Sequence, residues 1–240
     1  DMAARDFYVG SRPTKLGALL GERGQRGIVA DLQKKYKIRS LLEIGTGKGR
    51  VARACRDFGI DYFGIDCSAA VVEQAQADGF RVAYAFVPPV PDLGGFKPDV
   101  VVSIHTLSNL PSYEQVQGFV ASAGSCLDLG GLFLVIAPDL RFTRWSFWDP
   151  DLTRGFPTTR RRLARLLNQA GFEIIECSYQ LDGMGWPWCY LIYYGTKLIP
   201  YRLLDAITGR WTKRDLALYP SVWETIHHKA PDAYVLGRKR

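Results

Sequence analysis

Short apolar runs alternate with amphipathic stretches along most of the chain, and this alternation predicts the secondary structure. The apolar runs are rich in branched residues and end at glycine or polar positions, which is typical of buried strands; they lie at 39–44, 60–66, 81–85, 99–104, 132–137, 172–179 and 233–239. Between them, apolar side chains recur every three or four positions and predict helices at 15–36, 51–57, 68–78 (with Ser68 as its N-cap), 113–127 and 159–170. Strands that alternate with helices in this way predict an α/β fold, a doubly wound, mostly parallel, Rossmann-like sheet of seven strands covered on both faces.

The domain organisation follows from the same pattern. A chain of 240 residues is long enough for one α/β domain, so we expect a single domain over residues 1–240 that starts with an N-terminal helical segment at 1–37. Residues 181–232 separate the last two expected strands, where a hairpin needs only a short connection. We therefore expect an inserted, aromatic-rich helical segment before the last strand.

Charge and tryptophan are concentrated in the C-terminal part of the chain. The net charge is +7, and the whole excess lies in residues 141–240, because acidic and basic residues balance over 1–140. All six tryptophans also lie in this part: Trp145, Trp148, Trp186, Trp188, Trp211 and Trp223. We expect the first part to be a neutral scaffold and the second part to meet the substrate or a partner.

The remaining composition favours a cytoplasmic protein. Residues 1–30 lack the continuous apolar stretch of a secretory signal. The five cysteines have no paired spacing and the chain has three histidines, so we expect neither disulfides nor a metal site.

A glycine-rich turn follows the first expected strand. The run Glu43-Ile44-Gly45-Thr46-Gly47-Lys48-Gly49 lies where that strand turns into a helix, and glycine there permits positive φ and a close approach of the backbone to a ligand. The helix that follows offers N–H groups to an anionic group such as a carboxylate. Asp66 ends the next strand, where a carboxylate can accept hydrogen bonds from ribose hydroxyls. The spacing of these glycines differs from the GxGxxG fingerprint of nicotinamide-binding folds, which argues against NAD as the ligand.

These residues resemble the class I S-adenosylmethionine-dependent methyltransferase family. Glu43 to Gly49 is similar to the family's first motif, Asp66 to its ribose-binding acid, and residues 96–103 and 127–133 to the stretches around its fourth and fifth strands. The resemblance covers about residues 38–180 and the last strand. It implies a methyltransferase whose cofactor is S-adenosylmethionine, without indicating a subfamily.

The resemblance also implies which residues contact the cofactor. Glu43 and the backbone of the glycine turn would hold the methionine part, Asp66 the ribose, Cys67 the edge of the adenine, and Ser103 the region of the amino group. Many relatives place an acidic residue after the third strand, whereas Ala85-Phe86-Val87-Pro88 stands here and implies apolar packing against the ring. The cofactor-binding set is therefore Glu43, Gly45, Thr46, Gly47, Gly49, Asp66, Cys67, Phe86, Val87 and Ser103.

Methyl transfer from a sulfonium is an in-line displacement, for which alignment and exclusion of water matter most. A base is needed only if the acceptor must lose a proton. His105, which follows the fourth strand, is the best catalytic candidate; a loop histidine bonded to backbone is the alternative.

Other polar residues have ordinary structural interpretations. Asp139 either touches substrate or forms the turn after Pro138. The arginines from Arg160 to Arg165 are expected to lie on a solvated helix face. Asp149 and Asp151 are expected to form a turn or salt bridges, and His227 and His228 to pack at the surface or within the insertion.

Three interpretations of residues 181–232 remain open. The segment is a lid over a hydrophobic acceptor, a contact with a membrane surface, or an extra helical subdomain or dimer contact. Pro187, Gly195, Lys197, Pro200 and Arg202 interrupt its apolar part, which argues against a transmembrane span.

The expected acceptor is a small, largely apolar or aromatic molecule that is methylated on O, N or C. A membrane-peripheral enzyme acting on a lipid-linked or quinone-like acceptor is the alternative. An RNA methyltransferase and a non-catalytic cofactor-binding assembly protein rank lower. No specific nucleic acid is expected because residues 103–106 (Ser-Ile-His-Thr) lack the Asn/Asp-Pro-Pro-aromatic run of enzymes that methylate exocyclic amines of bases.

Overall fold

The computed structural model describes residues 15–148, 154–181, 184, 185, 187–198, 200 and 230–240. Within this part of the chain, seven strands form one sheet in the order β3-β2-β1-β4-β5-β7-β6. β7 runs antiparallel to the other six strands, which are parallel to one another. The doubly wound, mostly parallel sheet is therefore confirmed. Its strands are β1 (Ser40–Ile44), β2 (Asp61–Asp66), β3 (Val82–Tyr84), β4 (Val100–Ile104), β5 (Leu132–Pro138), β6 (Phe172–Gln180) and β7 (Asp232–Lys239).

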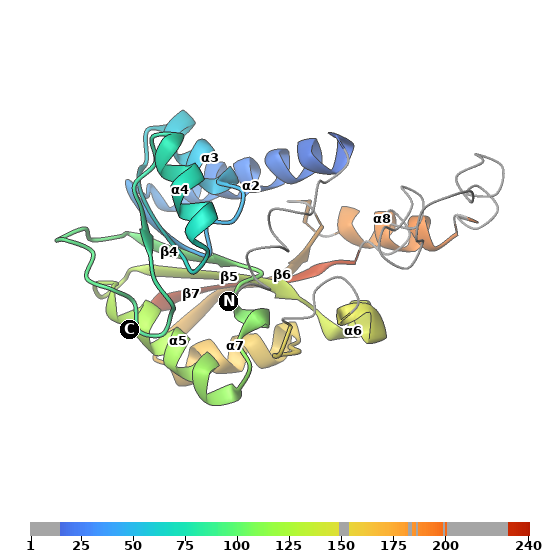
Figure 1. Cartoon of the computed structure of the whole chain (residues 1–240). Helices are drawn as coiled ribbons and strands as arrows, with labels where there is room; N and C mark the ends of the chain where they lie inside the picture. Colours follow the sequence, from blue (N-terminus) through green and yellow to red (C-terminus); the bar gives the residue numbers. More distant parts are fainter. Residues whose placement is uncertain (1–14, 149–153, 182–183, 186, 199, 201–229) are drawn as a thin grey trace.

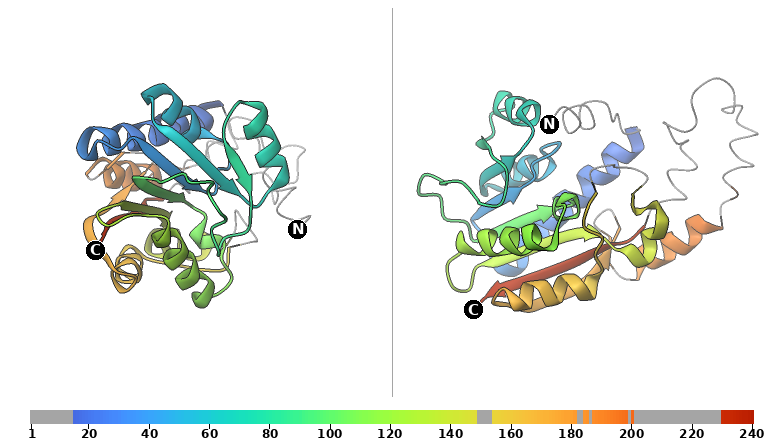
Figure 2. Two further views of the ribbon diagram at one scale, coloured as in Figure 1. Left: turned by 90° about the vertical axis from the view of Figure 1, so that its left-hand side faces the viewer. Right: turned by 60° about the horizontal axis from the view of Figure 1, so that its bottom comes forward.

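Helices cover both faces of the sheet (Figures 1 and 2). One face carries α2, α3 and α4, and the opposite face carries α5 and α7. The helix bounds are α2 (Lys15–Tyr36), α3 (Arg50–Phe58), α4 (Ala69–Ala77), α5 (Tyr113–Ser125), α6 (Leu140–Thr143), α7 (Arg160–Gln169) and α8 (Trp188–Lys197), with short 3-10 turns at Leu107–Asn109 and Arg144–Phe147.

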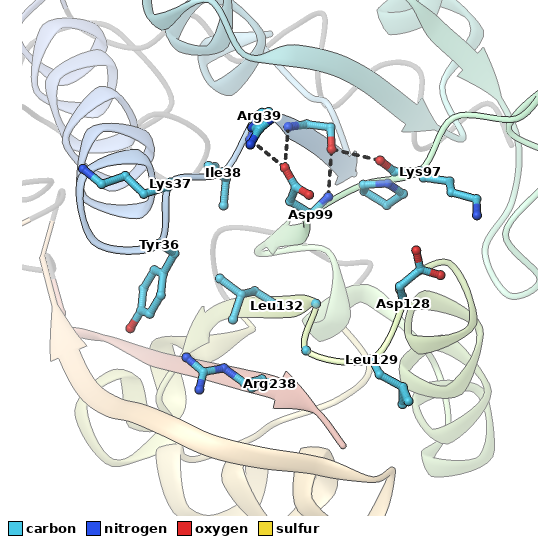
Figure 3. A pocket seen from close by; sticks show the side chains of 14 residues that line it. Tyr36, Lys37, Ile38, Arg39, Lys97, Asp99, Asp128, Leu129, Leu132 and Arg238 are labelled. Atoms are coloured by element: carbon cyan, nitrogen blue, oxygen red, sulfur yellow. Dashed lines mark hydrogen bonds between the residues drawn. The ribbon is translucent and has the colours of Figure 1, made fainter.

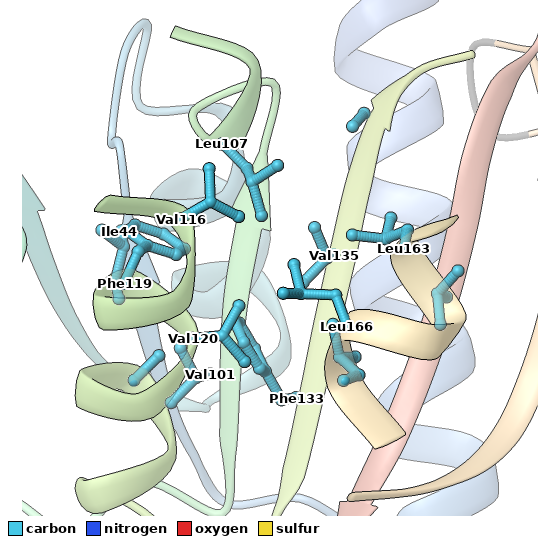
Figure 4. Packing of buried hydrophobic residues seen from close by; sticks show 14 of the residues in the cluster. Ile44, Val101, Leu107, Val116, Phe119, Val120, Phe133, Val135, Leu163 and Leu166 are labelled. Carbon is cyan, nitrogen blue, oxygen red and sulfur yellow. The ribbon is translucent and has the colours of Figure 1, made fainter. Parts of the chain in front are cut away.

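Two hydrophobic cores lie on the two sides of the sheet, because successive side chains of a strand point to opposite faces. Leu42 of β1 packs toward α5 and α7, whereas Leu41 packs toward α2, α3 and α4. Figure 4 shows the first of these cores, in which Val116 and Phe119 of α5 face the strands. All residues of β5 are buried, which explains why this strand is a continuous apolar run in the sequence.

Ser68 was predicted as the N-cap of α4, and the structure confirms its position. Ser68 occupies the N-cap position, but its hydroxyl makes no cap hydrogen bond and has no hydrogen-bond partner among the described residues. The Asp66 carboxylate instead accepts a hydrogen bond from the Ser68 backbone N–H at 2.9 Å. The Asp66 side chain therefore holds the backbone of the N-cap residue, but no side-chain cap of the first helical turn is present among the described residues.

The insertion leaves the sheet between β6 and β7, which pair as an antiparallel hairpin from Gln180 and Asp232 onward. Its described part contains α8, which extends beyond the ends of β6 and β7 (Figure 1). Cys189 of α8 is buried against Tyr179 and Leu181 at the end of β6. Among the described residues, none of the helices has the length and hydropathy needed to span a bilayer.

Candidate cofactor and active site

The glycine turn lies at the carboxyl edge of the sheet, next to the point where the chain winding changes direction. β1 has β2 on one side and β4 on the other, and the helices that follow β1 and β4 cover opposite faces. Ligands of open α/β sheets bind at such a switch point, beyond the carboxyl ends of the strands. The position of the turn therefore fits a ligand site.

Each glycine of the turn has a backbone conformation or contact that a side chain would disturb. Gly45 has φ +90°, and a Cβ added there would lie 2.0 Å from Oγ1 of Thr106. Gly47 has φ +50°, and a Cβ added there would meet no atom within 4 Å, so its backbone borders open space. Gly49 has φ +65° and is the N-cap of α3. The turn thus presents bare backbone to a ligand.

Asp66 lies across this turn at the end of β2. Its two carboxylate oxygens accept hydrogen bonds from the backbone N–H groups of Gly47 at 3.0 Å and Ser68 at 2.9 Å. Burial raises the pKa of Asp66, and these N–H groups oppose that rise. Since each carboxylate oxygen can accept two hydrogen bonds, the group can hold the turn and still accept from hydroxyls of a ligand.

Glu43 and Thr46 point into the protein, on the face covered by α2, α3 and α4. Each is only 3% exposed, and the Tyr62 hydroxyl donates a hydrogen bond of 2.6 Å to the Glu43 carboxyl group. Burial raises the pKa of Glu43 to about 8, so this side chain is mostly protonated at neutral pH. Both side chains support the glycine turn from inside the protein. Thr46 can therefore contribute only its backbone to the open side of the turn.

The ends of β2 and β3 form an apolar border next to Asp66. The backbone N–H of Ala85 donates to the carbonyl of Asp66 at 3.0 Å, which brings the residues after β3 alongside Asp66 and exposed Cys67. Phe86 is 57% exposed, and its ring packs edge-on against Tyr84 with centroids 5.9 Å apart. Val87 is partly buried. An aromatic surface is thus available beside Asp66.

Ser103 is fully buried in β4, and its hydroxyl has no hydrogen-bond partner among the described residues. It pairs with Val135 of β5 in the sheet. Its side chain is therefore enclosed by the protein, unlike those of Cys67 and Phe86.

His105 follows β4 directly and lies one residue from a contact with the glycine turn. The Thr106 hydroxyl donates to the backbone carbonyl of Ile44 at 2.9 Å, immediately before Gly45. Nε2 of His105 lies 2.9 Å from a carboxylate oxygen of Asp232, the first residue of β7. The structure therefore brings together His105, the glycine turn and Asp66.

Sequence reasoning missed Tyr62, Thr106 and Asp232. Tyr62 lies two residues before Gly64, which pairs with Glu43. The contact between Tyr62 and Glu43 could therefore be predicted only with knowledge of the register between β1 and β2. The other two side chains lie far along the chain from the groups they contact, and no sequence signal indicated them.

The other polar candidates have structural roles or lie outside the described residues. Asp139 is fully buried and accepts from the backbone N–H groups of Arg141 and Arg160, which supports the turn-forming interpretation. The Arg160 guanidinium lies 4.4 Å from the ring centroid of Tyr179, so this arginine packs on an aromatic ring. His227, His228 and Asp149 to Asp151 lie outside the described residues.

A hollow of about 560 Å³ lies at the opposite, amino-terminal edge of the sheet (Figure 3). Tyr36, Arg39, Asp99 and Arg238 are among its lining residues. Asp99 accepts backbone hydrogen bonds from Arg39 and Ser40, so its carboxylate holds the start of β1. The hollow is far from the glycine turn and at the edge where ligands of this fold do not normally bind.

A methyltransferase domain family matches the sequence over residues 11–177. The match covers well over half of the chain and includes the glycine turn, Asp66 and His105. The chain belongs to this methyltransferase family. It is an S-adenosylmethionine-dependent methyltransferase of class I.

Solved structures with the same fold agree with this assignment. The CcbJ methyltransferase from Streptomyces caelestis is 18% identical, with a TM-score of 0.63 over 98% of this chain and 96% of that chain. A SAM-dependent methyltransferase from Archaeoglobus fulgidus is 17% identical, with a TM-score of 0.59 over 92% and 99%. Human N-acetylserotonin methyltransferase, solved with SAM, is 15% identical, with a TM-score of 0.56 over 94% and 53%. No curated protein sequence matches this methyltransferase.

Proposed function

We propose that this methyltransferase methylates an oxygen, nitrogen or carbon atom of a small, largely apolar or aromatic acceptor. The observation that supports this is an aromatic cluster at the same edge of the sheet as the glycine turn. The Phe142 ring, in α6 after β5, meets the rings of Tyr179 at 5.1 Å and Tyr193 at 5.2 Å between centroids. The full aromatic cluster consists of Phe142, Tyr179, Tyr190, Tyr193 and Tyr194.

An aromatic cluster at this edge of the sheet suits an apolar acceptor for a physical reason. Removal of apolar and aromatic side chains from water is favourable, and these side chains exclude water from a bound ligand. Displacement at a methyl carbon depends on alignment of the acceptor and on that exclusion. The aromatic cluster therefore supports binding of an acceptor with a large apolar part.

The residues at the glycine turn fit the cofactor. In our proposal the backbone of Gly45 to Gly49 holds the methionine part, and Glu43 keeps the turn in shape from inside. Asp66 accepts from the ribose hydroxyls, while Cys67, Phe86 and Val87 border the adenine. Ser103 lies near the amino group of the cofactor's methionine part. When bound, S-adenosylmethionine supplies an electrophilic methyl carbon on a sulfonium.

Two measurements test this proposal. Calorimetry should detect binding of S-adenosylmethionine but not of NAD, and Asp66→Ala should weaken the affinity at least tenfold because a charge-assisted acceptor is lost. Asp61→Ala is the matched control, since Asp61 is an exposed aspartate at the other end of the same strand. Labelled methyl transfer into soluble and lipid extracts should then place the label in a small molecule. Tight NAD binding, equal effects of the two substitutions, or label only in RNA or protein would contradict the proposal.

An exposed stripe on α8 favours a second candidate, a membrane-peripheral enzyme acting on a lipid-linked acceptor. Trp188, Leu191, Tyr194 and Leu198 recur every three or four residues and are 61–85% exposed. Lys197 and Arg144 bring positive charge to one end of this stripe. Aromatic and apolar side chains flanked by cations are typical of helices that lie in the interface of anionic membranes.

Co-sedimentation distinguishes the two candidates. A membrane-peripheral enzyme should pellet with vesicles of equal parts phosphatidylglycerol and phosphatidylcholine, and less with phosphatidylcholine alone. Trp188→Ser with Leu191→Ser should lower the bound fraction at least tenfold, since each side chain contributes about 1.5–3 kcal/mol when buried. Leu129→Ser is the control, because Leu129 is 79% exposed at the opposite edge of the sheet. Protein that stays in the supernatant with both vesicles would refute the second candidate.

A further inference from the structure

His105 and Asp232 lie 127 positions apart in the sequence but meet at the carboxyl edge of the sheet. Asp232 pairs with Pro138 of β5 in the antiparallel ladder between β5 and β7. The backbone N–H of His105 donates to the carbonyl of Ile136 in the same strand β5 at 2.8 Å. Strand β5 therefore anchors both residues, Asp232 through the β5–β7 ladder and His105 through its backbone N–H in the turn after β4.

The backbone of His105 is held in a conformation that few residues other than glycine adopt. Its φ is +60°, and in addition to the N–H contact its carbonyl accepts a hydrogen bond of 2.8 Å from the Ser108 hydroxyl. Such a conformation is strained for a residue with a side chain and persists only where surrounding contacts enforce it, often at functional sites. Here the enforced turn presents the imidazole, which is 45% exposed, at the edge where the glycine turn lies.

We propose that His105 is the general base of this enzyme, that Asp232 positions it, and that the acceptor atom is a hydroxyl oxygen. The proposal rests on the function proposed above and specifies its acceptor. When Asp232 accepts the proton-bearing Nε2, the neutral ring has its lone pair on Nδ1.

That lone pair takes the hydroxyl proton of the acceptor as its oxygen bonds to the methyl carbon. The proton then passes from His105 to water, and the methyl ether carries no added charge. A hydroxyl needs this help because it is a weak nucleophile until it loses its proton, whereas an amine can attack through its own lone pair.

Imidazole NMR tests the pairing without any cofactor or acceptor. Long-range proton–nitrogen spectra should show His105 protonated at Nε2, and His105→Gly should remove these signals and so assign them among the three histidines. In Asp232→Asn the side-chain amide can donate to Nε2, so the proton should move to Nδ1. The same tautomer in both proteins would remove Asp232 from its positioning role.

Chemical rescue tests the base itself. Glycine tolerates the positive φ of His105, so His105→Gly should remove the imidazole and keep the turn. It should lower the rate of label transfer from S-adenosylmethionine to a cell extract by about 100-fold or more, and added imidazole should restore part of it. Asp232→Asn should lower the rate at least tenfold. Both variants should bind the cofactor as the wild type does.

The outcomes separate this inference from the function on which it rests. Label in a methyl ether, lost in His105→Gly and rescued by imidazole, supports both. A His105→Gly enzyme with full activity, or label on nitrogen or carbon, overturns the base and the hydroxyl acceptor but leaves methyl transfer intact. Cofactor binding without any labelled product contradicts the proposed function, and the tautomer spectra then still decide the role of Asp232.

Discussion

The buried carboxyl group of Glu43 should give this protein a distinctive dependence of stability on pH. The folded protein keeps Glu43 protonated up to about pH 8, whereas the unfolded chain releases this proton near its ordinary value of 4.5. Between these values the native state binds one proton more than the unfolded state, so the free energy of unfolding falls as the pH rises. The contribution of Glu43 is complete below pH 4.5 and is lost as the pH passes through 8.

The size of the effect follows from the same two pKa values. One proton corresponds to about 1.4 kcal/mol per pH unit, so the interval between 4.5 and 8 allows at most about 5 kcal/mol. Glu43→Gln keeps a side chain of the same shape and can still accept from Tyr62, but it has no proton to release. The free energy of unfolding of the variant should therefore rise relative to that of the wild type as the pH increases from 5 to 8.

Urea unfolding followed by tryptophan fluorescence at several pH values measures this difference. Other titrating groups act in both proteins, so their effects cancel when the two free energies are subtracted. Tyr62→Phe is the informative companion variant, because the Tyr62 hydrogen bond lowers the pKa of Glu43 and its loss should extend the decline to higher pH. A difference between wild type and Glu43→Gln that stays constant from pH 5 to 8 would refute the reasoning.

Three further substitutions have defined outcomes. Gly45→Ala should lower both the Tm and the cofactor affinity, because its Cβ would lie 2.0 Å from Oγ1 of Thr106 at a positive φ. Gly59→Ala is the control, since Gly59 also has a positive φ but a Cβ there would meet no atom within 4 Å. An equal effect of the two substitutions would exclude the contact with Thr106 as the cause. Phe86→Ala should weaken cofactor binding in calorimetry by about tenfold through loss of a stacking surface, and an unchanged affinity would remove Phe86 from the adenine site. Phe172→Ala should lower the free energy of unfolding by about 3–5 kcal/mol, because Phe172 is 1% exposed and packs on Phe133, while calorimetry should show unchanged cofactor affinity.

The sequence by itself determined the strands, the helices and the glycine turn. Strands such as β4 and β5 are buried on both faces and are therefore continuous branched apolar runs that need no tertiary information to find. The helix α2 was predicted with its observed bounds, Lys15–Tyr36. The turn was equally local, since glycine permits the positive φ that Gly45, Gly47 and Gly49 adopt.

Only the tertiary structure decided which side chains meet at the site. Tyr62 reaches Glu43 because β1 and β2 pair in one register, and a shift by one residue would turn the hydroxyl to the other face. His105 reaches Asp232 because β7 inserts antiparallel between β5 and β6, which brings the start of the last strand to the edge where the parallel strands end. Local periodicity specifies the elements, but contacts between distant residues depend on strand order and register, which no short stretch of sequence contains.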